Sequence, residues 1–181
     1  MKVHQTKQLK LSASVVAIGA FDGIHLGHQA VIRELVKKSH LEGVPSVVYT
    51  FYPPPRSYFQ GAKILTKPRK KIELIQNLGV DQLVLAEFNE KYLQRTAENF
   101  VNELFLLNPK VILVGDDFRF GYKRIGDVQL LKKYFTVQSV EPIYCINGEK
   151  ISSTKIRELM EQGEYKQVDS LLGRYNEAIK A

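Results

Sequence analysis

Strand-like and helix-like segments alternate regularly along this chain, and that order constrains the fold more than any other feature. Four short apolar runs rich in β-branched residues predict buried strands, and the segments between them have the apolar spacing and the end signals of helices. A strand, a helix and a second strand in this order form a parallel pair, with helices covering both faces of the sheet. We therefore predict an α/β three-layer sandwich with a parallel sheet. The predicted strands are 14–19, 45–51, 80–88 and 110–115, and the predicted helices between them are 27–43, 66–79 and 96–108.

The remaining segments carry turn signals and helix ends. Three successive prolines within 52–61 predict a loop, because proline fits neither a helix interior nor a central strand. Thr66 is expected to cap the helix at 66–79. Further along the chain, the sequence predicts a short helix at 126–135, an Asn-Gly hairpin within 135–152, and two short helices within 152–173 that Gly163 separates.

The size and the cysteine content limit the class of protein. The 181 residues fit one domain, which we predict to span 1–181. Cys145 is the only cysteine, so the chain can form no internal disulfide. The first ten residues are charged and polar, and no apolar run approaches the roughly 20 residues that cross a bilayer. We therefore expect a cytoplasmic protein with no membrane partner.

The net charge of +7 favours anionic partners. No basic-aromatic stacking motif for single strands stands out, so we expect no nucleic-acid partner. The charge is concentrated between Glu42 and Glu73, where no acidic residue lies. This stretch is interpreted either as a solvated basic face or as a positive wall beside a phosphate-bearing ligand. Its cations are Arg56, Lys63, Lys67, Arg69, Lys70 and Lys71.

The sequence GAFDGIHLGH at 19–28 joins the first predicted strand to the first predicted helix. Its glycines permit a tight turn and a close approach of the backbone to a ligand. His25 lies just before the helix and His28 on its first turn, so the two imidazoles can face the same side. A helix start offers unpaired N–H groups and partial positive charge, and imidazole can donate a hydrogen bond to a phosphoryl oxygen. The loop therefore predicts a site that holds a phosphate chain and stabilises charge during transfer.

Other phosphate and metal motifs fit this loop less well. A zinc site needs a third ligand, and nothing in the sequence places His4 or His40 nearby. The glycines are four apart, which departs from the G-x-G-x-x-G pattern of dinucleotide-binding loops, and no G-K-[ST] follows them. We predict no protein-bound metal cluster.

Several segments resemble a known family. The tetrapeptide at 25–28, His-Leu-Gly-His, resembles the H-x-G-H signature of the nucleotidylyltransferase superfamily, whose fold is a Rossmann-like three-layer sandwich. The whole loop is similar to the adenylyltransferase module of bacterial FAD synthetases. Nearly the whole chain shares the resemblance, in order. The further similar segments are TFYPPP at 50–55, VGDDFRFGYKRIGD at 114–127, ISSTKIRELMEQGE at 151–164 and LLGR at 171–174.

The resemblance implies an FMN adenylyltransferase, which transfers AMP from ATP to FMN and gives FAD and pyrophosphate. Mg²⁺ is expected with the ATP, because this ion bridges polyphosphate oxygens with few protein ligands. By the same resemblance, the catalytic residues are His25, His28 and Arg157. The implied ATP-binding residues are Gly19, Phe21, Asp22, Gly27, Asp117, Ser152, Ser153 and Thr154. The implied FMN-binding residues are Phe51, Pro53, Pro54, Arg56 and Phe118, with Tyr52 and Tyr58 as further rings for stacking.

The sequence departs from the family at two places. The family often has histidine where Pro54 stands, which leaves the flavin contacts open. Bifunctional members continue after LLGR-P-Y into a riboflavin kinase, whereas Arg174 is followed here by YNEAIKA. We therefore expect no riboflavin kinase domain and a dependence on a separate riboflavin kinase for FMN. Another H-x-G-H transferase, acting on a different phosphorylated acceptor, remains the alternative.

Overall fold

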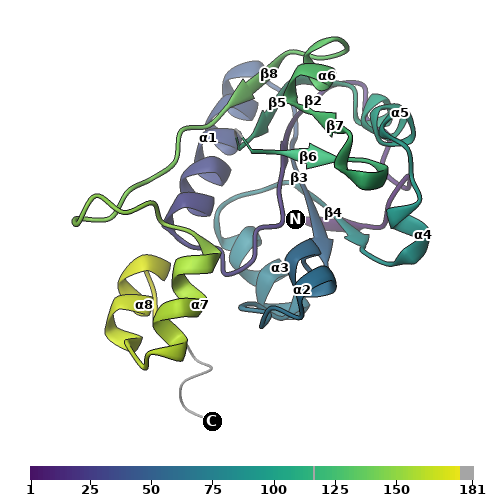
Figure 1. The fold of residues 1–181 in the computed structure, drawn as a ribbon. Helices are drawn as coiled ribbons and strands as arrows, with labels where there is room; N and C mark the ends of the chain where they lie inside the picture. The colour runs from purple at the N-terminus through teal and green to yellow at the C-terminus, as the bar shows by residue number, and fades with distance from the viewer. Residues whose placement is uncertain (116, 176–181) are drawn as a thin grey trace.

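A six-stranded parallel sheet forms the centre of the computed structural model, which describes residues 1–115 and 117–175 (Figure 1). The strand order is β1-β4-β3-β2-β5-β8, and the neighbouring strands in the sheet pair in parallel. The predicted parallel α/β sheet is therefore confirmed. The strands are β1 (Lys2–His4), β2 (Ser14–Ile18), β3 (Ser46–Tyr52), β4 (Gln82–Glu87), β5 (Pro109–Val114) and β8 (Val137–Ser139).

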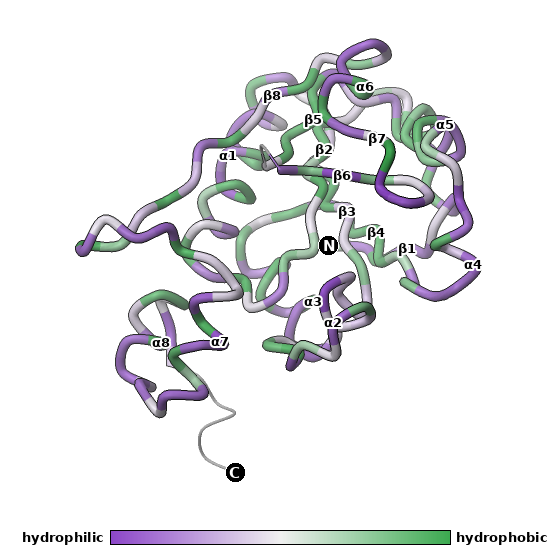
Figure 2. The backbone as a smooth tube through the Cα atoms, in the orientation of Figure 1, coloured by the Kyte–Doolittle hydropathy of each residue, from purple (hydrophilic) through white to green (hydrophobic). Residues whose placement is uncertain are grey.

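Alternate side chains of the central strands enter two different cores, as the two-residue period of a strand requires. In β2, Val15 and Ala17 pack with helices α1 and α3, whereas Val16 and Ile18 pack with α5 and α6. Figure 2 shows hydrophobic residues concentrated along β2, β3 and β5 in the centre of the sheet. The helices with these bounds are α1 (Leu26–Glu42), α2 (Pro55–Gln60), α3 (Pro68–Asn77), α4 (Glu90–Leu93), α5 (Ala97–Leu107), α6 (Val128–Lys132), α7 (Ser153–Glu161) and α8 (Tyr165–Leu172).

The sheet places the predicted phosphate loop at its centre. β2 pairs with β3 on one side and with β5 on the other, so the strand order reverses at β2. Connections from the carboxyl ends of strands around such a point diverge and leave a crevice, which is where ligands bind in open α/β sheets. The loops that follow β2, β3 and β5 all begin at this edge.

The segment after β3 departs from the prediction of a loop. Residues 55–60 form the short helix α2, because Pro55 occupies the first helical position, where its missing N–H costs nothing. Thr66 does not cap α3: Lys67 is the N-cap, and the Thr66 hydroxyl accepts a hydrogen bond from the N–H of Gly23 at 3.1 Å. The structure also contains three short strands that the sequence did not predict, namely β1, β6 (Arg119–Phe120) and β7 (Gly126–Asp127), and a single turn of 3₁₀ helix at Tyr122–Arg124.

The chain leaves the sheet after β8 and ends in a helical hairpin beside it (Figure 1). The expected Asn-Gly turn is present, but only one antiparallel bridge, between Tyr144 and Lys150, supports it. Helices α7 and α8 are separated by Gly163, as predicted, and share a small apolar core that also contacts Leu26 and Leu65. The predicted domain limit at residue 181 lies outside the described residues. None of the helices described is both long and apolar enough to cross a bilayer.

Candidate active site

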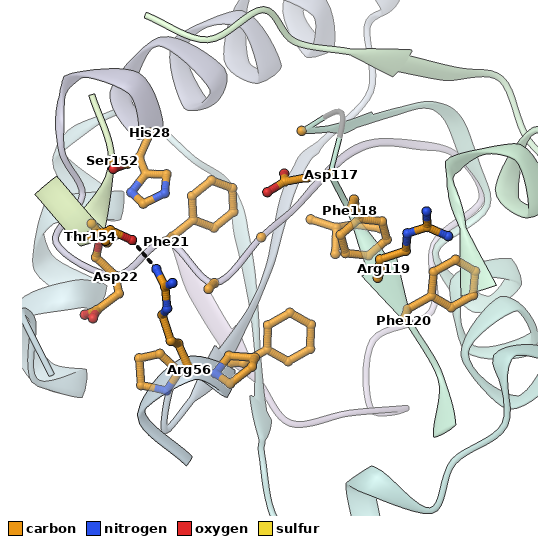
Figure 3. Close-up of a pocket in the computed structure, with 18 of the residues that line it drawn as sticks. Phe21, Asp22, His28, Arg56, Asp117, Phe118, Arg119, Phe120, Ser152 and Thr154 are labelled. Atoms are coloured by element: carbon orange, nitrogen blue, oxygen red, sulfur yellow. Dashed lines mark hydrogen bonds between the residues drawn. The ribbon is translucent and has the colours of Figure 1, made fainter. Parts of the chain in front are cut away.

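A cleft of about 680 Å³ opens at the carboxyl ends of β2, β3 and β5. Figure 3 shows its two sides. We use the name polar side for the residues at the starts of α1 and α7, namely His25, His28, Ser152, Ser153 and Thr154. We use the name aromatic side for Phe51, Phe59, Phe88, Tyr92, Phe118 and Phe120.

The two histidines of the polar side lie together, as their spacing predicts. His25 is the N-cap of α1, and its Nδ1 accepts a hydrogen bond from the N–H of His28 at 3.3 Å. The rings stack with centroids 3.6 Å apart and an interplanar angle of 18°, and the edge of Phe21 meets His28 at 5.2 Å. Because Nδ1 of His25 accepts this bond, the neutral ring carries its proton on Nε2. His25 therefore both starts the helix and retains a donor.

Burial keeps both imidazoles neutral at pH 7. Desolvation, together with the positive charge of Arg174, lowers the pKa of His25 to about 4. Desolvation, with smaller effects from His25 and Lys71, holds the pKa of His28 well below its usual value. Among the described residues, none bonds to the buried Nδ1 of His28. The negative charge of an incoming anion would offset this desolvation penalty and stabilise the protonated forms.

Two glycines make room for this arrangement. A side chain at Gly27 would bring its Cβ to 3.2 Å from the ring of His25, and one at Gly19 would bring its Cβ to 3.1 Å from the ring of Phe21. Both distances are shorter than ordinary van der Waals contact, so a side chain at either position would push the neighbouring ring out of place. The two predicted glycines therefore act by leaving space for neighbouring side chains.

The loop between β2 and α1 is strained and held from several directions. Phe21 and Ile24 have φ angles of 44° and 42°, which L-residues rarely adopt. Arg174, beyond the end of α8, donates hydrogen bonds to the carbonyls of Gly23 and Ile24. Gln29 also donates to the Ile24 carbonyl, at 3.0 Å. Sequence reasoning assigned no role to Arg174 or Gln29, although the LLGR match includes the arginine.

Asp22 and Arg157 line the cleft, but their charged groups bond to each other. The Asp22 carboxylate accepts from the Arg157 guanidinium at 2.6 Å and from the backbone N–H groups of Leu65 and Thr66 at 3.1 Å. Arg157 also donates to the carbonyl of Lys63 at 2.7 Å. This buried ion pair ties the β2–α1 loop to α7 and to the segment before α3. Its geometry suits a role in positioning the two helix starts.

The second helix start faces the same cleft. Ser152 is the N-cap of α7, and its hydroxyl accepts from the N–H of Lys155 at 3.2 Å. The Ser153 hydroxyl donates to the Asp22 carbonyl at 2.7 Å, and the Thr154 hydroxyl accepts from Arg56, which comes from α2 (Figure 3). The three hydroxyl residues predicted for phosphate binding therefore lie on the same side of the cleft as the histidines.

The aromatic side was predicted only in part. Phe51, Pro54, Arg56 and Phe118 line the cleft, whereas Pro53 is not among its lining residues. Tyr52 and Tyr58, which we expected to offer stacking surfaces, do not line it either. The residues that sequence reasoning missed are Phe59, Phe88, Tyr92 and Phe120. The position of Phe88 directly after β4, at the ligand-binding edge of the sheet, is a signal that could have identified it.

The described part of the chain contains no cluster of side chains that could ligate a metal ion. No group of three or more His, Cys, Asp or Glu side chains in these residues could hold a metal ion. His4, considered as a third zinc ligand, lies on the edge strand β1, and its imidazole forms a hydrogen bond with the side chain of Gln82 on β4 at 2.8 Å. Asp117, predicted to bind the nucleotide, is exposed and lines the cleft. The neighbouring Asp116 lies outside the described residues.

Known proteins match most of this chain. The family model for FAD synthetase matches residues 7–155. A relative from Geobacillus thermodenitrificans, whose name pairs riboflavin kinase with FMN adenylyltransferase, is 51% identical over 174 residues, covering 96% of this chain and 97% of the relative. The bifunctional riboflavin kinase/FMN adenylyltransferase of Escherichia coli K12 is 34% identical over 94% of this chain, which spans 58% of that relative's length.

A solved structure from Streptococcus pneumoniae, titled as a macrolide-efflux protein, matches the fold with a TM-score of 0.82. It is 29% identical, and the match covers 96% of this chain and 70% of that one. The family match includes the β2–α1 loop with its paired histidines, as well as the segments at 50–55 and 114–127. The chain belongs to the FAD synthetase family, whose members are nucleotidyltransferases.

Proposed function

We propose that this chain is an FMN adenylyltransferase, which transfers AMP from ATP to FMN and releases pyrophosphate. The observation that carries the proposal is the pair of stacked, neutral histidines at the start of α1, facing the same cleft as the aromatic side. A transfer between a nucleoside triphosphate and a flavin phosphate needs both: donors for the polyphosphate and flat apolar surfaces for the ring system.

On the polar side, the triphosphate lies between two helix starts. His25 and His28 donate N–H groups toward the α-phosphate, where charge grows as the bond to pyrophosphate breaks. Ser152, Ser153 and Thr154 at the start of α7 supply hydroxyls and free backbone N–H groups to the departing phosphates. Gly19, Phe21 and Asp117 line the rest of the nucleotide site.

The chemistry then consists of positioning and charge neutralisation. A phosphate oxygen of FMN attacks the α-phosphorus of ATP, a new P–O bond forms, and the bond to the β-phosphate oxygen breaks in line with it. In this proposal, the Asp22–Arg157 pair holds the two helix starts at the correct separation, and Arg157 acts through that pair.

On the aromatic side, the isoalloxazine ring packs against the flat faces of phenylalanine side chains, chiefly Phe51 and Phe118. Arg56 reaches from α2 to Thr154 at the start of α7, so its guanidinium lies at the junction of the two sides. In the ternary complex it exchanges this hydroxyl for the FMN phosphate. Pro54 lines the cleft beside it and shapes that junction.

Magnesium and FMN come from outside the chain in this proposal. Mg²⁺ enters as the Mg–ATP complex, because this ion bridges polyphosphate oxygens with few protein ligands. FMN is itself a phosphorylated riboflavin, so the reaction depends on a riboflavin kinase activity that supplies it.

The test is incubation of the purified protein with ATP, Mg²⁺ and FMN, followed by chromatography for FAD and an assay for pyrophosphate. We expect the two products in equal amounts. Parallel reactions with pantetheine phosphate and nicotinamide mononucleotide test other acceptors. Turnover with one of these and none with FMN would show that the chain is an H-x-G-H transferase with a different acceptor.

A further inference from the structure

Lys71 is a lysine of α3 that is completely buried. Its ammonium group donates to the Ala20 carbonyl at 2.7 Å, to the Phe51 carbonyl at 3.2 Å and, more weakly, to the Thr50 hydroxyl at 3.5 Å. These acceptors lie where β2 and β3 end. The residue belongs to the basic stretch of the sequence, yet its side chain runs inward beneath the cleft.

The charge of Lys71 is not neutralised by a direct ion pair with any described residue. Its three hydrogen-bond partners are neutral, and a buried charge without a salt-bridge partner is costly. The carboxylate of Asp22 is the group of opposite sign that acts on Lys71. That carboxylate already bonds to Arg157 and to two backbone N–H groups. The interior therefore holds an excess positive charge at this point.

This charge lies beneath residues that line the cleft. Ala20 and Phe51, whose carbonyls Lys71 holds, both line the cleft. The Thr50 hydroxyl donates to the same Ala20 carbonyl at 3.0 Å, so the ammonium joins the loop after β2 to the end of β3. The charge of Lys71 also acts on His28 and contributes to the lowering of its pKa. An anion bound at the histidines would complement this charge through a low-dielectric layer.

We propose that Lys71 is a positioning residue for the triphosphate: its ammonium fixes the backbone of Ala20 against β3 and supplies a buried positive charge behind the bound ATP. The proposal rests on the proposed binding of ATP in this cleft, but it does not depend on FMN as the acceptor. A lysine retained in a costly position fits a role in binding better than a role in stability.

The proposal also predicts that Lys71 changes its protonation state when ATP binds, which can be measured as proton uptake. Desolvation lowers the pKa of Lys71 to about 8, and Asp22 opposes this shift. The groups that face it are the carbonyls of Ala20 and Phe51, the Thr50 hydroxyl, Asp22 and the imidazole of His28. A bound triphosphate favours the ammonium form, so at pH 8 the protein should take up part of a proton when ATP binds.

The first experiment measures Mg–ATP binding without FMN by isothermal titration calorimetry. We expect Lys71→Met to weaken ATP binding about tenfold, as the loss of a buried complementary charge at short range would do. Lys70→Met, a change at the neighbouring half-buried lysine that pairs with Glu73 and does not line the cleft, is the matched control and should bind ATP as the wild type does. Wild-type affinity in folded Lys71→Met would overturn the proposal.

The second experiment repeats the titration at pH 8 in two buffers of different ionisation enthalpy, which reports proton uptake. Uptake should occur in the wild type and be absent in Lys71→Met. The wild-type measurement alone tests the proposal even if the variant does not fold. If the wild type takes up no proton at pH 8 when ATP binds, the proposal is wrong.

These outcomes are independent of the acceptor. If ATP binding depends on Lys71 but FMN gives no FAD, the proposed acceptor is wrong and the role of Lys71 stands. If ATP and FMN give FAD while Lys71→Met retains full ATP affinity, the proposed function stands and the role of Lys71 is wrong. In kinetic terms, we expect Lys71→Met to raise the KM for ATP and to leave the KM for FMN unchanged.

Discussion

The polar side and the aromatic side of the cleft differ in how the chain assembles them. The polar side consists of two helix starts, and its decisive residues His25 and His28 lie within one four-residue stretch. The aromatic side gathers rings from α2, from the ends of β3 and β4, from α4 and from the segment after β5. Directional hydrogen bonds hold the first, whereas ring contacts between distant segments hold the second.

This difference predicts different responses to mutation. A lost donor on the polar side removes an interaction that strengthens in the transition state, so it should lower turnover. A lost ring on the aromatic side removes contact area that the flavin has in both the bound substrate and the transition state, so it should raise KM for FMN and leave turnover nearly unchanged. The predictions below test this division.

The largest effect is expected at His28. Replacing His28 with Ala should lower kcat by about 10²–10³-fold, because the loss of one donor to developing charge costs about 3–4 kcal/mol. Steady-state kinetics with ATP and FMN measures it. His40→Ala, an exposed change at the other end of α1, is the control and should leave kcat unchanged. Full turnover in His28→Ala would mean that the imidazole is structural.

The polar side was also the part of the site that the sequence predicted best. A strand, a tight turn and a helix start follow one another within 14–28, so the spacing of His25 and His28 fixes their relative position without any knowledge of the rest of the fold. The same locality explains why the alternation of strands and helices predicted the parallel sheet. Local geometry and hydrophobic period suffice for both.

The aromatic side could not be predicted in the same way. Phe88, Tyr92 and Phe120 come from three separate segments, and nothing local distinguishes a phenylalanine of the cleft from one of the core. Lys71 shows the same limit for charge: it stands between the half-buried Lys70 and the apolar Ile72, and only the packing of α3 buries it completely. Pro55 misled the prediction because the same residue can break a helix or begin one.

The second prediction concerns the stability of the polar side in acid. His25 has a pKa of about 4 in the folded chain, below the ordinary value of 6.5. The unfolded chain therefore binds more protons between these values, and the folded state should lose about 3 kcal/mol of stability as the pH falls from 6.5 to 4. His28 has the same sign of shift and adds to this loss.

Urea unfolding of the wild type and of His25→Asn at pH 7.5 and pH 4.5 measures the contribution of His25. Asparagine is a good N-cap and does not titrate, so the variant should keep the start of α1 and lose less stability on acidification. An equal loss in both proteins would show that His25 is already protonated or exposed in the folded state. The aromatic side, which has no titrating group in this range among its rings, offers no such dependence.

The smallest effect is expected on the aromatic side, at Phe118. Its ring stacks on Phe120 with centroids 5.6 Å apart and is only partly buried, so Phe118→Ala should leave the fold intact. Because an aromatic pair contributes about 0.5–1.5 kcal/mol beyond its buried area, we expect KM for FMN to rise about threefold to tenfold, with kcat and the KM for ATP nearly unchanged.

Phe105→Ala is the matched control for this change, since Phe105 is half exposed on α5 and does not line the cleft. It should leave all three constants unchanged. A fall in kcat in Phe118→Ala at saturating FMN would break the division between the two sides, because the ring would then orient the flavin phosphate for attack as well as bind the flavin. Such a result would make both sides of the cleft parts of one catalytic arrangement, joined at Arg56.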